Sequence, residues 1–215
     1  MNEEVPFSVP VATVRALLRV APTADARRCL NGVHLDPAGY AVATDGAVLL
    51  AVRIAPAARP PATVPVASMT LACKETPKGA SVRVFSEYIE TPVAPRVQAK
   101  RGADGAPWAR VSYEDIGAAR YPDWRRVLRP AAFSDNGKPA AYASALLERL
   151  RAALNILTGA DRPILHVLPH GSDCAGVCYP VPDNAVALIM PSRPPHATFD
   201  APAHLAQFLK PDILE

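Results

Sequence analysis

The stretch that decides the fold runs from Leu30 to Val52 and reads LNGVHLDPAGYAVATDGAVLLAV. It predicts three short strands, because apolar runs alternate with two turns. The turns are residues 36–39 (DPAG) and 44–46 (TDG). Each combines an Asp that bonds the backbone ahead of it with a Gly that tolerates positive φ. The stretch on its own therefore predicts an antiparallel meander whose last strand is apolar enough to be buried on both faces.

The same pattern extends outward from this meander in both directions. Apolar residues at helical spacing predict helices over residues 10–21, 67–76 and 144–157, and period-two or continuously apolar runs predict strands. The strands are expected at residues 7–9, 64–66, 81–85, 88–97, 108–113, 140–143, 164–168, 176–181 and 185–190. The chain thus predicts three successive β-α-β-β-β units at weak mutual similarity.

Composition narrows the class of protein. Half of the 215 residues are apolar, so a packed core is expected. The net charge of +3 is compatible with nucleic acid without requiring it. No apolar run approaches the roughly 18 residues of a membrane span, and the N-terminus lacks an apolar leader segment. We therefore expect a soluble, cytoplasmic protein with reduced cysteines.

Three segments carry a family resemblance. The first is Leu-Asn-Gly-Val followed by an Ala-Thr-Asp-Gly turn, within residues 30–46. The second is YPDWRRVL at residues 121–128, and the third is LIMPSR at residues 188–193. In this order and spacing they resemble the bacterial DNA polymerase III beta subunit, the sliding clamp. The resemblance covers residues 5–194.

The resemblance implies an α+β, DNA-clamp-like fold with curved antiparallel sheets and helices on one face. Residues 1–120 are similar to the family's complete second domain, and residues 121–194 to the connector and half of the third. Residues 195–215 are an extension, expected to form a short amphipathic helix that packs on the core or on another chain. The chain is thus expected to be a shortened variant, without the family's first domain and half of its third, of the kind that a phage or mobile element encodes.

The resemblance also implies a function without catalysis and without cofactors. Family members are processivity factors of DNA replication that encircle double-stranded DNA and recruit DNA polymerase and other clamp-binding proteins through linear motifs. The family ring contains twelve β-α-β-β-β units, so chains of three units would close it as a homo-tetramer. The alternative is an interaction module or decoy that binds clamp-interacting peptides without encircling DNA.

The family's peptide pocket and DNA channel map onto two sets of residues. The pocket set is Leu30, Thr44, Gly46, Leu49, Pro122, Val127, Leu188, Met190, Pro191 and Arg193. The DNA-facing set is Arg15, Arg19, Lys74, Lys78, Arg149 and Arg151. The chain departs from the family at two places, with Ala47-Val48 in place of His-Arg and Ser192-Arg193-Pro194 in place of Met-Arg-Leu. These departures predict a less polar pocket with altered specificity.

Two competing chemistries were considered. His166, His170, Cys174 and Cys178 could supply zinc ligands, although their spacing differs from the usual Cys-x2-Cys hairpin. For an enzyme, His170, Ser172 and Asp173 are neighbours in one loop, which is not how catalytic triads are assembled. No phosphate-binding glycine loop is present in the sequence. The sequence therefore favours a binding protein.

Overall fold

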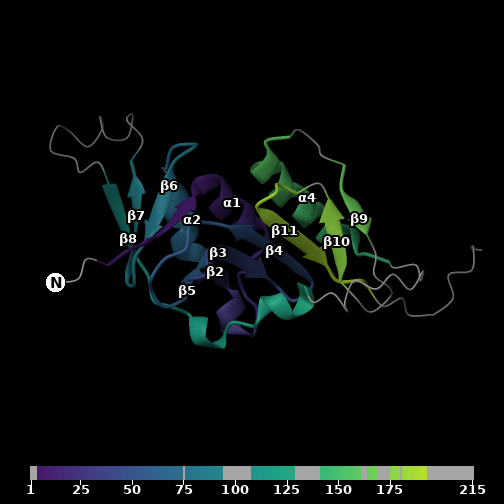
Figure 1. Ribbon diagram of the computed structural model, residues 1–215, viewed down its shortest axis with the longest axis horizontal. Helices are drawn as coiled ribbons and strands as arrows, with labels where there is room; N and C mark the ends of the chain where they lie inside the picture. The colour runs from purple at the N-terminus through teal and green to yellow at the C-terminus, as the bar shows by residue number, and fades with distance from the viewer. Residues whose placement is uncertain are drawn as a thin grey trace, which may run out of the picture.

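The computed structural model describes residues 4–74, 76–93, 108–128, 141–160, 164–168, 175–179 and 181–192. Figure 1 shows the second unit at one end, the third at the other, and the first between them. The first unit consists of β1 (Phe7–Pro10), α1 (Val11–Val20), β2 (Gly32–Asp36), β3 (Tyr40–Thr44) and β4 (Val48–Arg53). A short 3-10 helix, η1 (Arg28–Leu30), precedes β2.

The second unit repeats this order. It consists of β5 (Ala62–Pro65), α2 (Val66–Lys74), β6 (Ser81–Val84), β7 (Tyr88–Pro92) and β8 (Trp108–Ser112). The third unit contains α4 (Ser144–Thr158), β9 (His166–Leu168), β10 (Gly176–Tyr179) and β11 (Ala185–Ile189). Two 3-10 helices, η2 (Ala118–Arg120) and η3 (Trp124–Leu128), lie in the connector. The helices and strands thus follow the predicted order.

One predicted element differs in the structure. Residues 140–143 were expected to form the first strand of the third unit. Ala141 instead makes a single antiparallel bridge with Ser192, and residues 129–140 lie outside the described part of the chain.

Two antiparallel sheets organise the molecule. One has the strand order β1-β6-β7-β8, and the other has the order β5-β2-β3-β4-β11-β10-β9. The first and second units interlock, because each donates its first strand to the sheet of the other. The third unit joins the first through β4 and β11, with Leu49 opposite Leu188. One continuous seven-stranded sheet therefore runs from the second unit to the third.

The helices share one layer over these sheets. α1 packs against α2 on one side and against α4 on the other, and Figure 1 shows the three following one another across the molecule. Their apolar faces bury side chains such as Leu17, Met69 and Leu154 against both sheets in one core. Among the described residues, no helix is long and apolar enough to cross a membrane.

Candidate functional site

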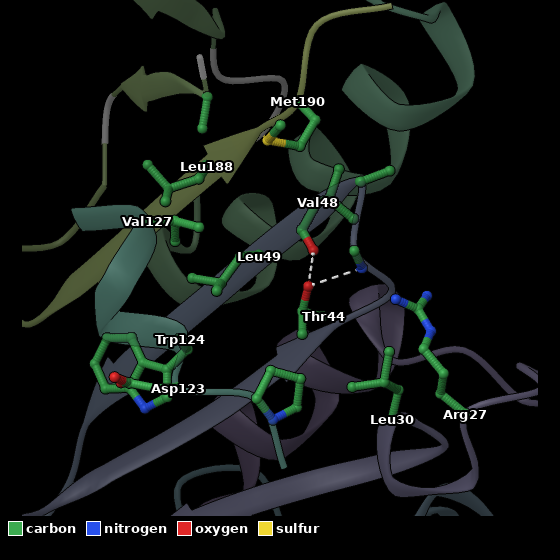
Figure 2. A pocket seen from close by; sticks show the side chains of 14 residues that line it. Arg27, Leu30, Thr44, Val48, Leu49, Asp123, Trp124, Val127, Leu188 and Met190 are labelled. Carbon is green, nitrogen blue, oxygen red and sulfur yellow. Dashed lines mark hydrogen bonds between the residues drawn. The ribbon is translucent and has the colours of Figure 1, made fainter. Parts of the chain in front are cut away.

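A pocket lies where the first unit, the connector and the third unit meet. It encloses about 180 Å³. Its walls come from the β3–β4 turn, β4, η3 and β11, and Figure 2 shows the side chains converging from these elements. The lining residues are Arg27, Leu30, Thr44, Gly46, Ala47, Val48, Leu49, Pro122, Asp123, Trp124, Val127, Ala175, Leu188 and Met190. Most of these side chains are apolar, so the pocket suits an apolar ligand group.

The β3–β4 turn shapes one wall. The Thr44 hydroxyl donates to the Val48 carbonyl at 2.7 Å and accepts from the Gly46 amide at 3.0 Å (Figure 2). The Asp45 carboxylate accepts from the amides of Ala47 and Val48 at 2.8 and 2.9 Å. Gly46 has φ +89°, and a Cβ there would lie 3.1 Å from the Arg27 guanidinium. Glycine therefore serves both the turn and the close approach of Arg27.

An ion pair ties this turn to the third unit. Arg149 on α4 donates to the Asp45 carboxylate at 2.6 Å and to the Val20 carbonyl at the end of α1, also at 2.6 Å. Burial acts to raise the pKa of Asp45, but hydrogen bonds from the Val48 amide and from Arg149 hold it below the ordinary aspartate value. Arg149 therefore fixes the turn relative to two helices.

Replacing Arg149 with methionine is expected to lower the free energy of unfolding by about 1.5–3 kcal/mol, because Asp45 and two helix-end carbonyls lose a charged donor. The matched control is Arg151→Met. Arg151 is two residues away on the same helix and pairs with Glu148 at the surface. That variant should unfold at the wild-type urea concentration, and equal midpoints for the two variants would contradict the role given to Arg149.

Trp124 closes the opposite side of the pocket. Its side chain is 6% exposed and lies in a small apolar cluster with Leu49 and Leu188. The ring packs against Tyr40 with centroids 5.2 Å apart. The connector therefore forms a wall of the pocket and also covers the β4–β11 seam.

Comparison with known proteins places this architecture. No protein-family model and no curated protein sequence matches the chain significantly. The DNA polymerase sliding clamp from Caulobacter crescentus matches in structure with a TM-score of 0.58 at 14% identity, over 90% of this chain and 68% of that one. The fold is that of the bacterial sliding clamp. The Pseudomonas aeruginosa clamp bound to griselimycin matches with a TM-score of 0.58 at 15% identity, over 90% of this chain and 68% of that one. The Bacillus subtilis clamp matches with a TM-score of 0.55 at 14% identity, over 90% and 66%. This chain spans about two thirds of the length of these clamps.

The clamp-derived pocket set is largely brought together. Eight of its ten members line the one pocket: Leu30, Thr44, Gly46, Leu49, Pro122, Val127, Leu188 and Met190. Pro191 follows Met190 but does not line it, and Arg193 lies outside the described residues. Sequence reasoning missed Arg27, Asp123, Trp124 and Ala175 as lining residues. Asp123 and Trp124 belong to the quoted YPDWRRVL motif, so the motif itself could have indicated them.

The clamp-derived DNA-facing set divides into two groups. Arg15 donates to the carbonyls of Cys73 and Thr76, Arg149 pairs with Asp45, and Arg151 pairs with Glu148. The other three, Arg19, Lys74 and Lys78, are exposed. The prediction that all six are available to phosphates therefore needs correction. The sequence pattern does not show that a helix-end carbonyl or a carboxylate already engages an arginine.

The zinc candidates are separated where the structure describes them. On the β9–β10 pair Cys178 lies opposite Val167, and His166 lies opposite Tyr179. Successive strand residues point to opposite faces, and accordingly Cys178 is buried while His166 is exposed. Burial raises the pKa of the Cys178 thiol to about 12, which disfavours the thiolate that zinc needs. His170 and Cys174 lie outside the described residues, and none of the described His, Cys, Asp and Glu side chains gather in a metal-binding group.

Proposed function

We propose that the protein is a clamp-like DNA-replication factor that docks short peptide motifs of partner proteins and holds duplex DNA. The observation that carries the proposal is the apolar pocket at the β4–β11 seam, where three motifs far apart in sequence meet. Catalysis has no part in this function.

The pocket favours a linear peptide with bulky apolar side chains. Leu49, Leu188 and Met190 offer apolar surface, and the Met thioether can adapt to ligands of different shape. Where the clamp family has His-Arg, Ala47 and Val48 line this wall. Arg27 and Asp123 are the charged groups among the lining residues. We infer that apolar contact dominates affinity and that these two charges select the flanking residues of the peptide.

Val127 offers a test of peptide docking that spares the core. It lines the pocket, yet its side chain is 38% exposed. Val127→Asp is expected to weaken binding of a short peptide with adjacent Leu and Phe side chains at least tenfold, because a carboxylate would be desolvated by the ligand. Val5→Asp, at an exposed apolar residue outside the pocket, is the control. Equal affinity of the two variants in a fluorescence titration would contradict docking in this pocket.

DNA would be held through the helix layer. The exposed Arg19, Lys74 and Lys78 can meet phosphates without reading sequence. Such contacts weaken steeply as salt rises. Because three units are present per chain, four chains would supply the twelve units of a clamp ring, and the domain limits at residues 120 and 194 belong to this proposal.

A second function is favoured by one observation. Three of the six arginines and lysines proposed to face DNA already have internal partners. This favours an interaction module or decoy that binds clamp-interacting peptides without encircling DNA.

Circular DNA separates the two functions. A ring would stay on a closed circle and slide off after the circle is cut, at a rate that increases with salt. A module would bind the Leu-Phe peptide equally well and would show no difference between circular and linear DNA.

A further inference from the structure

The first and second units show how two units of this fold complete each other. In each, the strand just before the helix leaves its own unit and adds to the sheet of the other. Pro10, just before α1, lies opposite Ser81 at the start of β6, and Pro65, just before α2, lies opposite Gly32 at the start of β2. The exchange is reciprocal, so it follows a two-fold relation between the units.

The third unit lacks this counterpart within the described residues. Its strand β9 occupies the place that β2 and β6 hold in the other units, yet it forms the outer edge of the seven-stranded sheet. Around this edge, Ile164 is 74% exposed and Leu168 is 51% exposed. The corresponding strand of the first unit, β2, is almost wholly buried. An open edge with exposed apolar side chains is a template for another strand.

The helix of the third unit is also covered on one flank only. α1 lies between α2 and α4, whereas α4 packs against α1 alone among the described helices. Arg149 points to α1, since it donates to the Arg19 and Val20 carbonyls. Leu147 and Arg151 are each two residues away, about 200° around the helix, and so lie on the outer flank. This flank adjoins the β9 edge in the same unit.

We propose that a second copy of this chain covers this face, with the two third units interlocking about a two-fold axis as the first and second units do. Each copy would place the residues that enter α4, starting at Ala141, along β9 of the other, and the two α4 helices would pack side by side. Such an interface is isologous, so the surface that needs a partner is also the partner.

Charge on this face permits self-association. The outer flank of α4 carries Arg151 together with Glu148, and these two pair with each other. Like charges that would repel across a two-fold axis are thus neutralised within each copy. The proposal rests on the internal repeat of the fold and requires neither DNA nor peptide binding. Two chains joined this way contribute six units, half of a twelve-unit ring.

Mass in solution tests the interface. Light scattering of the full chain should give an even number of 22.8 kDa copies. The variant Ile164→Asp/Leu168→Lys should halve that number at equal protein concentration. Both side chains are more than half exposed, so the fold should persist, as checked by circular dichroism. Leu71→Lys, at another exposed leucine on α2, should keep the wild-type mass.

Amide hydrogen exchange gives a second readout. The β9 amides should be protected in the wild type and exchange rapidly in the double variant. A strict monomer, or a mass unchanged by the double variant, would overturn the proposal. Protected β9 amides in a monomer would show that residues 193–215 of the same chain cover the edge, and would overturn it as well. The double variant should still bind the Leu-Phe peptide, so failure of this interface is distinguishable from failure of the pocket.

Discussion

Replacing Trp124 with alanine is expected to lower the free energy of unfolding by about 3–5 kcal/mol, the usual loss for a buried Trp or Phe. The ring fills the cluster over the β4–β11 seam and packs on Tyr40. The Arg125 guanidinium lies 4.4 Å from the Trp124 ring centroid and donates to Asp36 at 2.6 Å. Truncation therefore leaves a cavity and removes the platform under a cation. Urea denaturation followed by circular dichroism measures the loss.

Two variants isolate the cause. The buried Trp124 Nε1 has no hydrogen-bond partner among the described residues, so Trp124→Phe keeps the apolar ring and discards only an unsatisfied donor. It should lose less than about 1.5 kcal/mol. Val127→Ala, in the same 3-10 helix but half-exposed, should lose little. If the alanine and phenylalanine variants of Trp124 are equally stable, the ring does not support the seam.

Acid should destabilise the protein through His34. This side chain stacks on Tyr121 with centroids 4.1 Å apart, and its Nδ1 lies 3.0 Å from the Thr63 hydroxyl. Burial lowers the pKa of His34 to about 4, from an ordinary value of 6.5. The unfolded chain therefore binds a proton that the folded chain refuses between these values. The stabilising contribution is complete above pH 6.5, and about 3 kcal/mol of it is lost as the pH falls to about 4.

The pH window separates His34 from the carboxylates. Burial acts to raise the pKa values of Asp36 and Asp45, but hydrogen bonds hold both below the ordinary value of 3.8. Their contributions are therefore lost at lower pH. Urea midpoints between pH 7 and 4.5 should fall steeply for the wild type and much less for His34→Gln. The control His166→Gln, which removes an exposed histidine, should keep the steep fall, and a flat wild-type profile would contradict the prediction.

The sequence predicted the local structure better than the contacts between elements. Turn chemistry at Asp36 and Asp45 and the apolar period of α4 are properties of neighbouring residues, so the strands and helices could be predicted in order. The pairing of β4 with β11 was reached only through the resemblance of short motifs, because no local pattern specifies which strands meet.

The misses in the candidate site have the same origin. Arg27 reaches the pocket because Asp25 and the Asp45 carbonyl hold its guanidinium. Arg149 was assigned to DNA, although it binds Asp45 far away in the sequence. A charged side chain that serves a turn or a helix end looks the same in a sequence as one that serves a ligand. Only the folded geometry separates the two.

The pairing of β4 with β11 has a consequence for biosynthesis. Leu49 leaves the ribosome long before its partner Leu188 is translated. During that interval the apolar edge of β4 waits without its neighbour, and the cavity beside it has no third wall. Nascent chains therefore cannot capture a client peptide, and binding competence arises only when the last strand docks. Closing this long loop is an entropically slow step, so we infer that maturation of the protein is timed by its C-terminal segment.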